Sequence, residues 1–417
     1  MANLEHRKAN AKVQLLGKDG KALCNTEVSI NQINHEFLFG CGAFESLAYA
    51  NYNSDINTFT SIKGKSIDFS VIEDRMNKWL NLFNFGTLPF YWGGFEPEEG
   101  KPHTEELMKA AKFLQSKDVT VKGHTLCWQT VYAPWLLKYS DEEIYQKQLQ
   151  RISRDVGDFK GLVDMWDVIN ETVIMPIYDK YENPATRICN YKGRANLIKA
   201  VFNQAKEANP DGIFLINDFN LSEKYQAIIK EALDSKVPIH TIGVQSHQHH
   251  GVWGKEHVDE MLTRFEGFGL PIHFTENTIV AGPAVDPSII DLQDAHYEDD
   301  AATPEYEEMQ ADELEKMYRN LFENHPLVTA ITNWDFGDGA WLNAPSGVIR
   351  KDGSLKPSYN RLHKLIKEEW HTQVKTKTDS QGFVEFTGFK GKYEIAAKDR
   401  KSAFTLSSKQ KEIKVEL

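Results

Sequence analysis

The chain has 417 residues, enough for one large domain or two ordinary ones, and its hydrophobic content allows a sizeable core. A formal net charge of −12 argues against nucleic-acid binding, which needs a basic face, and suits a neutral substrate better than an anionic one. No apolar run approaches the roughly 20 residues that a membrane span requires.

Both ends of the chain alternate apolar and polar residues in the manner of β-strands. Residues 12–16 run into a hairpin-like turn at residues 18–21. Further short strands are expected at residues 26–30, 383–386, 393–396 and 413–417. Neither end has enough apolar residues to fold well alone. We therefore predict that residues 1–35 and 372–417 meet in one small β-sandwich.

Between these ends, over residues 36–371, apolar segments alternate with helical ones. The apolar segments lie at residues 37–42, 82–85, 119–124, 163–169, 213–216, 239–244, 271–274 and 328–331. The expected helices lie at residues 71–80, 104–115, 142–156, 195–209, 222–235, 257–268, 306–324 and 359–369. This alternation predicts an α/β fold, a closed (β/α)8 TIM barrel with its helices outside. The acidic residues 286–308 are expected to form a loop over the barrel mouth, near the seventh strand.

Polar and aromatic side chains follow the expected strands at one end of this barrel. In strand order they are His124 and Trp128; Asn170 and Glu171; Asn217 and Asp218; Gln245 and His247; Glu276; and Trp334, Asp338 and Trp341. In a barrel these strand ends ring one mouth. Two carboxylates on separate strands, among aromatic and amide groups, are typical of a glycosidase. One carboxylic acid protonates the leaving oxygen, and the other attacks the anomeric carbon or activates water.

These motifs resemble glycoside hydrolase family 10, the retaining endo-β-1,4-xylanases. The matching stretches are residues 123–128 (GHTLCW), 166–171 (WDVINE), 214–220 (FLINDFN), 243–247 (GVQSH), 271–276 (PIHFTE) and 357–359 (PSY). Each motif is modest evidence alone, but six in the right order are strong evidence. The terminal segments also resemble the plant-like branch of the family, which carries similar β-rich flanks.

The resemblance implies a role for each motif residue. Glu171 would be the general acid/base, Glu276 the nucleophile, and Asn170 a partner of the sugar 2-hydroxyl. The subsite of the sugar being cleaved would be lined by His124, Trp128, Gln245, His247, Trp334 and Trp341. The substrate would be an oligo- or polysaccharide, and catalysis would need no cofactor or metal. The family implies a secreted or periplasmic protein, although the polar first ten residues predict no signal peptide.

Two departures from the family pattern fall near the second and third strands. The family's Asn-Glu-x-Lys run is replaced by residues 87–92 (TLPFYW), and the His and Gln expected after Trp128 are Gln129 and Val131. We expect Phe90, Tyr91 and Val131 to make the distal subsite apolar. Our hypothesis is a decorated or methylated glycan, another β-linked sugar or an aryl glycoside as substrate, with Tyr91 among the binding residues.

A third departure follows the expected nucleophile. The family's Leu-Asp, whose Asp usually orients the strand-six His, is replaced by Asn277 and Thr278, which predicts that His247 has lost its partner. This change leaves open a catalytically impaired, carbohydrate-binding barrel. A metal-dependent hydrolase using residues 247–250 (HQHH) is a weaker alternative, because no carboxylate or cysteine set accompanies these histidines. Purely structural roles also remain open: the two tryptophans after the eighth strand could be core residues, and His124 could be a structural histidine.

Overall fold

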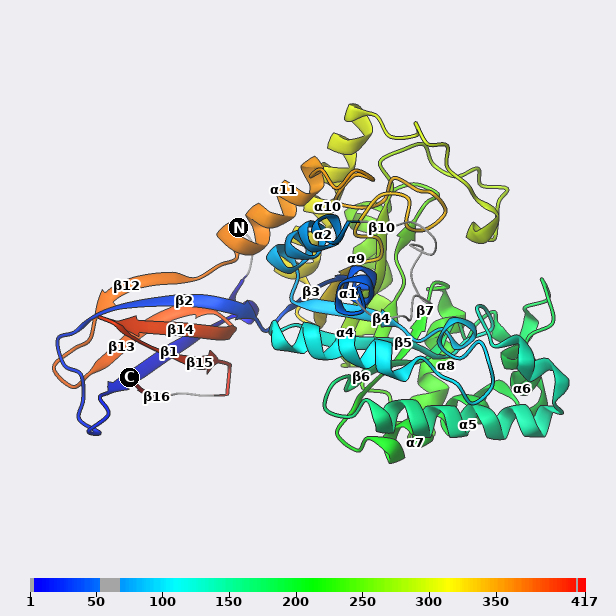
Figure 1. Ribbon diagram of the computed structural model, residues 1–417, viewed down its shortest axis with the longest axis horizontal. Coiled ribbons are helices and arrows are strands. Elements are labelled where there is room, and N and C mark those ends of the chain that lie inside the picture. The colour runs from blue at the N-terminus through cyan, green and yellow to red at the C-terminus, as the bar shows by residue number, and fades with distance from the viewer. Residues whose placement is uncertain (1–3, 53–67, 410–411) are drawn as a thin grey trace.

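A closed barrel of parallel strands forms the centre of the computed structural model, which describes residues 4–52, 68–409 and 412–417. Among these residues the strand order is β11-β3-β4-β5-β6-β7-β8-β10, and pairing of β10 with β11 closes the circle (Figure 1). The strands are β3 (Leu38–Gly42), β4 (Phe85–Pro89), β5 (Thr120–Cys127), β6 (Met165–Asn170), β7 (Ile213–Asp218), β8 (Thr241–Val244), β10 (Ile272–Ile279) and β11 (Val328–Asn333). The predicted TIM barrel is confirmed.

Helices cover the outside of this barrel. The longer ones are α2 (Phe69–Leu82), α4 (Thr104–Ser116), α5 (Asp141–Asp158), α7 (Arg194–Ala208), α8 (Glu223–Asp234), α9 (Gly254–Glu266), α10 (Pro304–Asn324) and α11 (Pro357–Lys364). Shorter helices are α1 (Phe44–Ala50), α3 (Trp92–Phe95) and α6 (Pro184–Lys192). Every residue of β4, β6, β8 and β10 is buried, because the barrel interior covers one face of each strand and the helices cover the other.

Two strands run further than the sequence predicts. His124 and Glu276 were expected at strand ends, but they lie inside β5 and β10. Both strands lose regular register there: β5 against β6 beyond His124, and β10 against β11 beyond Phe274. A register irregularity interrupts the side-chain alternation of a strand and re-aims individual residues. The apolar pattern therefore located these residues correctly but placed the strand ends too early.

The terminal segments form two small sheets at one side of the barrel (Figure 1). One sheet has the order β13-β1-β16, and the other has the order β12-β2-β14-β15. Their bounds are β1 (Lys8–Leu16), β2 (Glu27–His35), β12 (Gln373–Lys377), β13 (Phe383–Phe389), β14 (Gly391–Ala397), β15 (Arg400–Leu406) and β16 (Ile413–Glu416). Side chains from both sheets, including Val13, Ile30 and Ile395, bury one another in a separate apolar cluster.

The expected hairpin-like turn at residues 18–21 is present, with an antiparallel bridge between Leu16 and Ala22, but the first two strands do not pair along their length. β1 pairs with β13 and β16, whereas β2 pairs with β12 and β14, so the turn at residues 18–21 leads from one sheet to the other.

Arg7 fixes the N-terminal segment to the base of the barrel. Its buried guanidinium donates hydrogen bonds to the carbonyl oxygens of Phe322, His325 and Val328, at 2.8, 2.9 and 2.8 Å.

The division into a sandwich of residues 1–35 and 372–417 and a barrel of residues 36–371 stays a proposal. No helix in the described part of the chain is long and apolar enough to cross a membrane.

Candidate active site

The two glutamates singled out by sequence lie toward the carboxyl ends of barrel strands, at the mouth of the barrel. Glu171 follows β6 directly, and Glu276 lies within β10. Their residues are 8% and 4% exposed. Glu171 has a φ of 58°, a left-handed conformation that costs energy for a residue with a side chain. The fold therefore holds this carboxyl in place at some energetic cost.

Glu276 is surrounded by hydrogen-bond donors and positive charge. Asn217 Nδ2 donates to Glu276 Oε1 at 2.7 Å, and His247 Nε2 lies 3.1 Å from Oε2. His124 Nδ1 lies 3.9 Å from Oε1. Burial alone would raise the pKa of Glu276, but the neighbouring histidines and Lys122 outweigh it, and the pKa falls below the usual value. Glu276 is therefore ionised at neutral pH.

Glu171 has the opposite electrostatic environment. Burial raises its pKa to about 8, and the negative charges of Asp218 and Glu276 add to the rise. Hydrogen bonding with the side chains of Trp128 and Gln129 opposes it. Gln129 Nε2 donates to Glu171 Oε2 at 2.5 Å, so one of the residues that departs from the family pattern holds this carboxyl directly. Glu171 therefore carries a proton near neutral pH, beside a carboxylate that does not.

Asn217 connects the two glutamates, and the predicted site residues did not include it. Its Nδ2 donates to Asn170 Oδ1 at 2.8 Å as well as to Glu276, and its Oδ1 accepts from Thr275 Oγ1 at 2.7 Å. A Cβ at Gly243 would lie 2.4 Å from Asn217 Oδ1, so only glycine leaves room for this side chain. The signal was present in the sequence, because Asn217 ends the fifth predicted strand.

Gln245 and Asn170 complete this polar network. Gln245 Nε2 donates to Asn170 Oδ1 at 3.1 Å, and Asn170 Nδ2 lies 3.5 Å from Glu171 Oε1. An unbroken series of amide contacts therefore connects the proposed acid with the proposed nucleophile.

A second buried network, formed with Lys122 and Asp167, orients His124. Asp167 Oδ2 accepts from Lys122 Nζ at 2.6 Å and lies 2.7 Å from His124 Nδ1. All three side chains are essentially inaccessible to solvent. Burial would raise the pKa of Asp167, but Lys122 and His124 outweigh it and lower the pKa, so the carboxylate stays charged. A charged Asp167 keeps a proton on His124 Nδ1 and fixes the ring.

The expectation that His247 lacks a partner is wrong. Thr278 Oγ1 lies 3.0 Å from His247 Nδ1, while Nε2 of the same ring faces Glu276. Threonine can fill the position because its hydroxyl can donate to a ring nitrogen. It orients the imidazole but, unlike a carboxylate, brings no negative charge to the site. Thr278 replaces a carboxylate partner with a neutral one.

Four aromatic side chains surround these polar groups. Ring centroids of Tyr91 and Trp128 are 5.7 Å apart, and those of Tyr91 and His124 are 5.5 Å apart. Trp334 meets His124 edge-on at 5.2 Å, and Trp341 lies 4.8 Å from His247. The structure therefore brings all ten predicted site residues together, with the tryptophans at the site rather than apart from it in the core.

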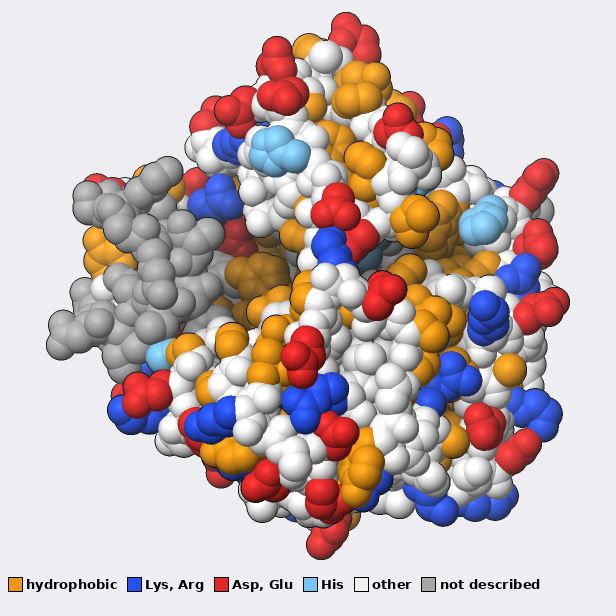
Figure 2. Space-filling view, turned by 90° about the vertical axis from the view of Figure 1, so that its right-hand side faces the viewer, with side chains coloured by type: hydrophobic (Ala, Val, Ile, Leu, Met, Phe, Trp, Pro, Cys, Tyr) orange, Lys and Arg blue, Asp and Glu red, His pale blue; other side chains and the backbone are white. Residues whose placement is uncertain are grey.

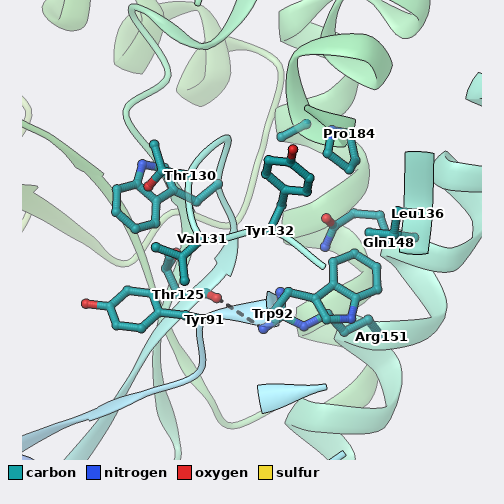
Figure 3. A pocket seen from close by; sticks show the side chains of 12 residues that line it. Tyr91, Trp92, Thr125, Thr130, Val131, Tyr132, Leu136, Gln148, Arg151 and Pro184 are labelled. Carbon is teal, nitrogen blue, oxygen red and sulfur yellow. Dashed lines mark hydrogen bonds between the residues drawn. The ribbon is translucent and has the colours of Figure 1, made fainter. Parts of the chain in front are cut away.

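Beyond Tyr91 the mouth continues into a small pocket between the ends of β4 and β5 and helix α6. It is lined by Tyr91, Trp92, Thr125, Trp128, Thr130, Val131, Tyr132, Leu136, Gln148, Arg151, Pro184 and Ala185 (Figure 3). Val131 is 48% exposed at its edge. Phe90 was expected here, but it is fully buried in the barrel wall against Phe95, Phe159 and Trp166.

The histidines at residues 247–250 have separate surroundings. His249 Nδ1 lies 3.2 Å from Tyr297 Oη, and His250 Nδ1 lies 3.3 Å from Val285 O. Over residues 4–52, 68–409 and 412–417, no three His, Cys, Asp or Glu side chains are arranged to hold a metal ion.

Known proteins share this architecture. The chain is 28% identical to endo-1,4-beta-xylanase A of Caldicellulosiruptor saccharolyticus over 258 residues, which are 58% of this chain and 71% of that protein. The crystal structure of xylanase 10B from Thermotoga petrophila in complex with xylobiose superimposes with a TM-score of 0.62, over 80% of this chain and 95% of that one. Its sequence identity is 23%, so this likeness shows the fold alone.

A longer match covers the terminal sheets as well. Anti-sigma-I factor RsgI6 of Acetivibrio thermocellus is 25% identical over 399 residues, 94% of this chain. The chain spans only 45% of that protein's length. The sequence model of glycosyl hydrolase family 10 matches residues 89–364, which include both glutamates, their amide network and the aromatic wall. That match covers well over half of the chain, and the chain therefore belongs to glycosyl hydrolase family 10.

Proposed function

We propose that the protein is a retaining glycoside hydrolase that cleaves β-linked glycans by double displacement. The observation that carries this proposal is a pair of buried carboxyls connected by amide contacts at the barrel mouth, one with a raised pKa and one with a lowered pKa. A general acid must hold a proton and a nucleophile must not. Family membership supports the same assignment.

In the first step Glu171 gives its proton to the glycosidic oxygen while a carboxylate oxygen of Glu276 bonds to the anomeric carbon. The glycosidic bond breaks, the leaving group departs as an alcohol, and a glycosyl ester remains on Glu276. This ester is uncharged, so Glu171 loses one of the charges that raise its pKa. Glu171 then takes a proton from water, whose oxygen attacks the anomeric carbon and frees Glu276.

The remaining site residues bind the sugar in this proposal. Asn170 bonds the 2-hydroxyl, and the donation from Asn217 and Gln245 to its carbonyl oxygen turns its NH2 group toward the cleft. The aromatic and histidine side chains form the walls of the subsite: Tyr91, His124, Trp128, His247, Trp334 and Trp341. Apolar ring faces suit the C–H faces of a sugar, and the polar groups suit its hydroxyls.

The pocket beyond Tyr91 supports an altered substrate. A site built to bond hydroxyls rejects ligands that lack them, and an apolar site gains nothing from a free hydroxyl. We therefore propose that the distal sugar carries a methyl or other apolar decoration, or that an aryl group or another β-linked sugar replaces it. Members of the family typically act outside the cell, and we propose the same for this protein.

The test compares kcat/KM for xylo-oligosaccharides, their O-methylated forms and aryl β-xylosides, together with a product profile on a glycan panel. The proposal expects the methylated or aryl substrates to be favoured. A preference for unsubstituted xylo-oligosaccharides would refute the altered subsite and leave the hydrolase assignment intact. The absence of any turnover, together with measurable glycan binding, would favour the carbohydrate-binding barrel, for which the uncharged Thr278 is the supporting observation.

A further inference from the structure

The loops after β6 and β10 meet across the barrel mouth. These two strands carry the glutamates and are separated in the barrel by β7 and β8. A contact between their loops therefore crosses the barrel mouth. Figure 2 shows a hollow on this face that is crossed near its middle by a narrow bridge on which basic and acidic side chains meet.

Lys180 makes this contact. Its Nζ donates to Asp291 Oδ2 at 2.7 Å and to Asp294 Oδ1 at 2.8 Å. The other oxygen of Asp291 accepts from the backbone N–H of Gln293 at 2.9 Å, so this carboxylate is held by its own chain before it meets the lysine. One ammonium between two carboxylates is a stronger arrangement than an isolated surface pair.

The loop after β10 is firmly anchored on its own side. Val285, Ala295 and Tyr297 bury one another in a small apolar cluster. The backbone N–H of Val285 donates to His249 O at 2.8 Å, and that of Tyr297 donates to Leu342 O at 3.1 Å. The two aspartates lie between these anchored points, on a fixed projection toward the opposite loop.

The loop after β6 is equally supported. Thr186 Oγ1 donates to Met175 O at 2.7 Å, which ties the start of α6 to the 3-10 turn η3 (Met175–Ile177). Rings of Tyr178 and Tyr181 meet edge-on at 5.2 Å on either side of Lys180. Burial raises the pKa of the Tyr178 hydroxyl, and the charges of Asp291 and Glu171 contribute to the rise. Tyr178 therefore lies near both the bridge and the proposed general acid.

The position of the bridge relative to the bound sugar decides its consequence. The aromatic wall of the cleaved sugar includes Tyr91, Trp128 and Trp334, which follow β4, β5 and β11. The bridge joins the loops that follow the two glutamate-bearing strands, and Tyr181, next to Lys180, packs against Tyr132 with ring centroids 5.8 Å apart. A polysaccharide chain could be laid across the cleft at this point only after the bridge opened.

We propose that Lys180, with Asp291 and Asp294, forms a charged bridge over the cleft and limits the length of glycan that can be laid into it. The inference rests on the proposed hydrolase function and deepens it. The bridged enzyme accepts short oligosaccharides and aryl glycosides directly, and it cleaves the interior of a polymer only when the ion pairs open. Lys180 is a specificity residue, remote from the bond that breaks.

The first experiment compares the ratio of kcat/KM on a soluble β-glycan polymer to kcat/KM on an aryl β-glycoside. Lys180→Ala should raise this ratio roughly two- to fivefold, with little change on the aryl substrate. Lys192→Ala is the matched control, because Lys192 donates to Glu142 at 2.7 Å on the outer helices and should leave the ratio unchanged. A Lys180→Ala ratio equal to that of wild type would overturn the proposal.

A second experiment reports the bridge without relying on activity. Lys180→Cys and Asp294→Cys are combined with Cys24→Ser, which removes the exposed native thiol. Intramolecular cross-linking by a short bismaleimide, detected by mass spectrometry, supports the contact, and the cross-linked enzyme should lose polymer cleavage while keeping aryl-glycoside cleavage. Failure to cross-link, or cross-linking that spares polymer cleavage, would overturn the proposal. A wild-type enzyme that hydrolyses no glycoside would instead refute the proposed function.

Discussion

The two halves of the barrel mouth are built differently. On the side of β6, β7, β8 and β10, polar side chains bond one another in an unbroken series that includes Asn170, Asn217, Gln245, His247 and Glu276. On the side of β4 and β5, Tyr91, Trp92, Val131 and Tyr132 line a pocket in which aromatic and aliphatic groups predominate.

The difference follows from the elements that carry each half. The polar half lies largely on strands or directly at their ends, where one altered side chain would leave a buried donor or acceptor without its partner. The apolar half lies partly on the loop after β5, where Val131 is exposed and its substitution disturbs few other groups. We therefore expect the bonded polar residues to tolerate little substitution, whereas residues on the loop after β5 can be replaced more freely.

The largest expected effect comes from removing the proposed nucleophile in the polar half. Glu276→Gln should lower kcat by at least about 10³-fold on every glycoside, because an amide cannot form the glycosyl ester. Glu171→Gln should lose a comparable factor on substrates with poor leaving groups and much less on an activated aryl glycoside, which needs no proton. Equal losses for Glu171→Gln on both substrates would contradict its role as the acid.

Asn217 should have the next largest effect. Asn217→Ala removes a donor from Glu276 and another from Asn170, and we expect kcat/KM to fall by about 10–100-fold. Asn209→Ala is the matched control, because Asn209 donates to Asp164 at 2.7 Å at the opposite end of the same two strands. If Asn209→Ala lost as much activity as Asn217→Ala, the effect would be one of stability, which thermal unfolding of both variants measures independently.

The pH profile should separate the two carboxyls. The protonated form of Glu171 is the active one, so kcat/KM should fall about tenfold per unit as pH rises beyond about 8. The ionised form of Glu276 is the active one, and its lowered pKa places the acid limb below the usual range of a glutamate. In Glu171→Gln the basic limb should disappear, and its persistence would assign that limb to another group.

Sequence alone located the fold and nearly all of the site because barrel strands and their polar ends leave a local pattern. Hydrophobic runs marked each strand, and Asn170, Glu171, Gln245 and Glu276 stand out as polar residues at or near the ends of such runs. Helix ends were equally readable: the helix expected at residues 104–115 is α4, Thr104–Ser116.

The errors have a different origin, since they concern partners that are distant in sequence. Nothing local reveals that Thr278 faces His247, that Gln129 reaches Glu171, or that Phe90 points into the barrel wall. The meeting of the two ends was predicted, but the individual strand pairs were not, because β1 pairs with β13 more than 360 residues away. Alternation identifies a strand but not its neighbour.

Thr278 offers a smaller test within the polar half. Its hydroxyl can donate to His247 Nδ1 and so keep the Nε2 proton directed at Glu276. Thr278→Val should lower kcat/KM by about three- to tenfold and move the acid limb to higher pH, because the ionised Glu276 loses support. Thr278→Ser keeps the hydroxyl and should keep both values. An unshifted acid limb in Thr278→Val would show that the hydroxyl only fills space.

The smallest expected effect lies in the apolar half. Val131→Gln places an amide at the exposed edge of the pocket, and it should raise kcat/KM for unsubstituted xylo-oligosaccharides relative to methylated ones by about two- to threefold. Val252→Gln is the control, because Val252 is equally exposed but follows β9 (His247–Gln248), away from this pocket. The polar half is untouched, so activity on a simple aryl glycoside should not change in either variant. If both variants shifted this preference, the polarity of the surface at the mouth would determine the substrate preference. The pocket beyond Tyr91 would then not recognise the distal sugar.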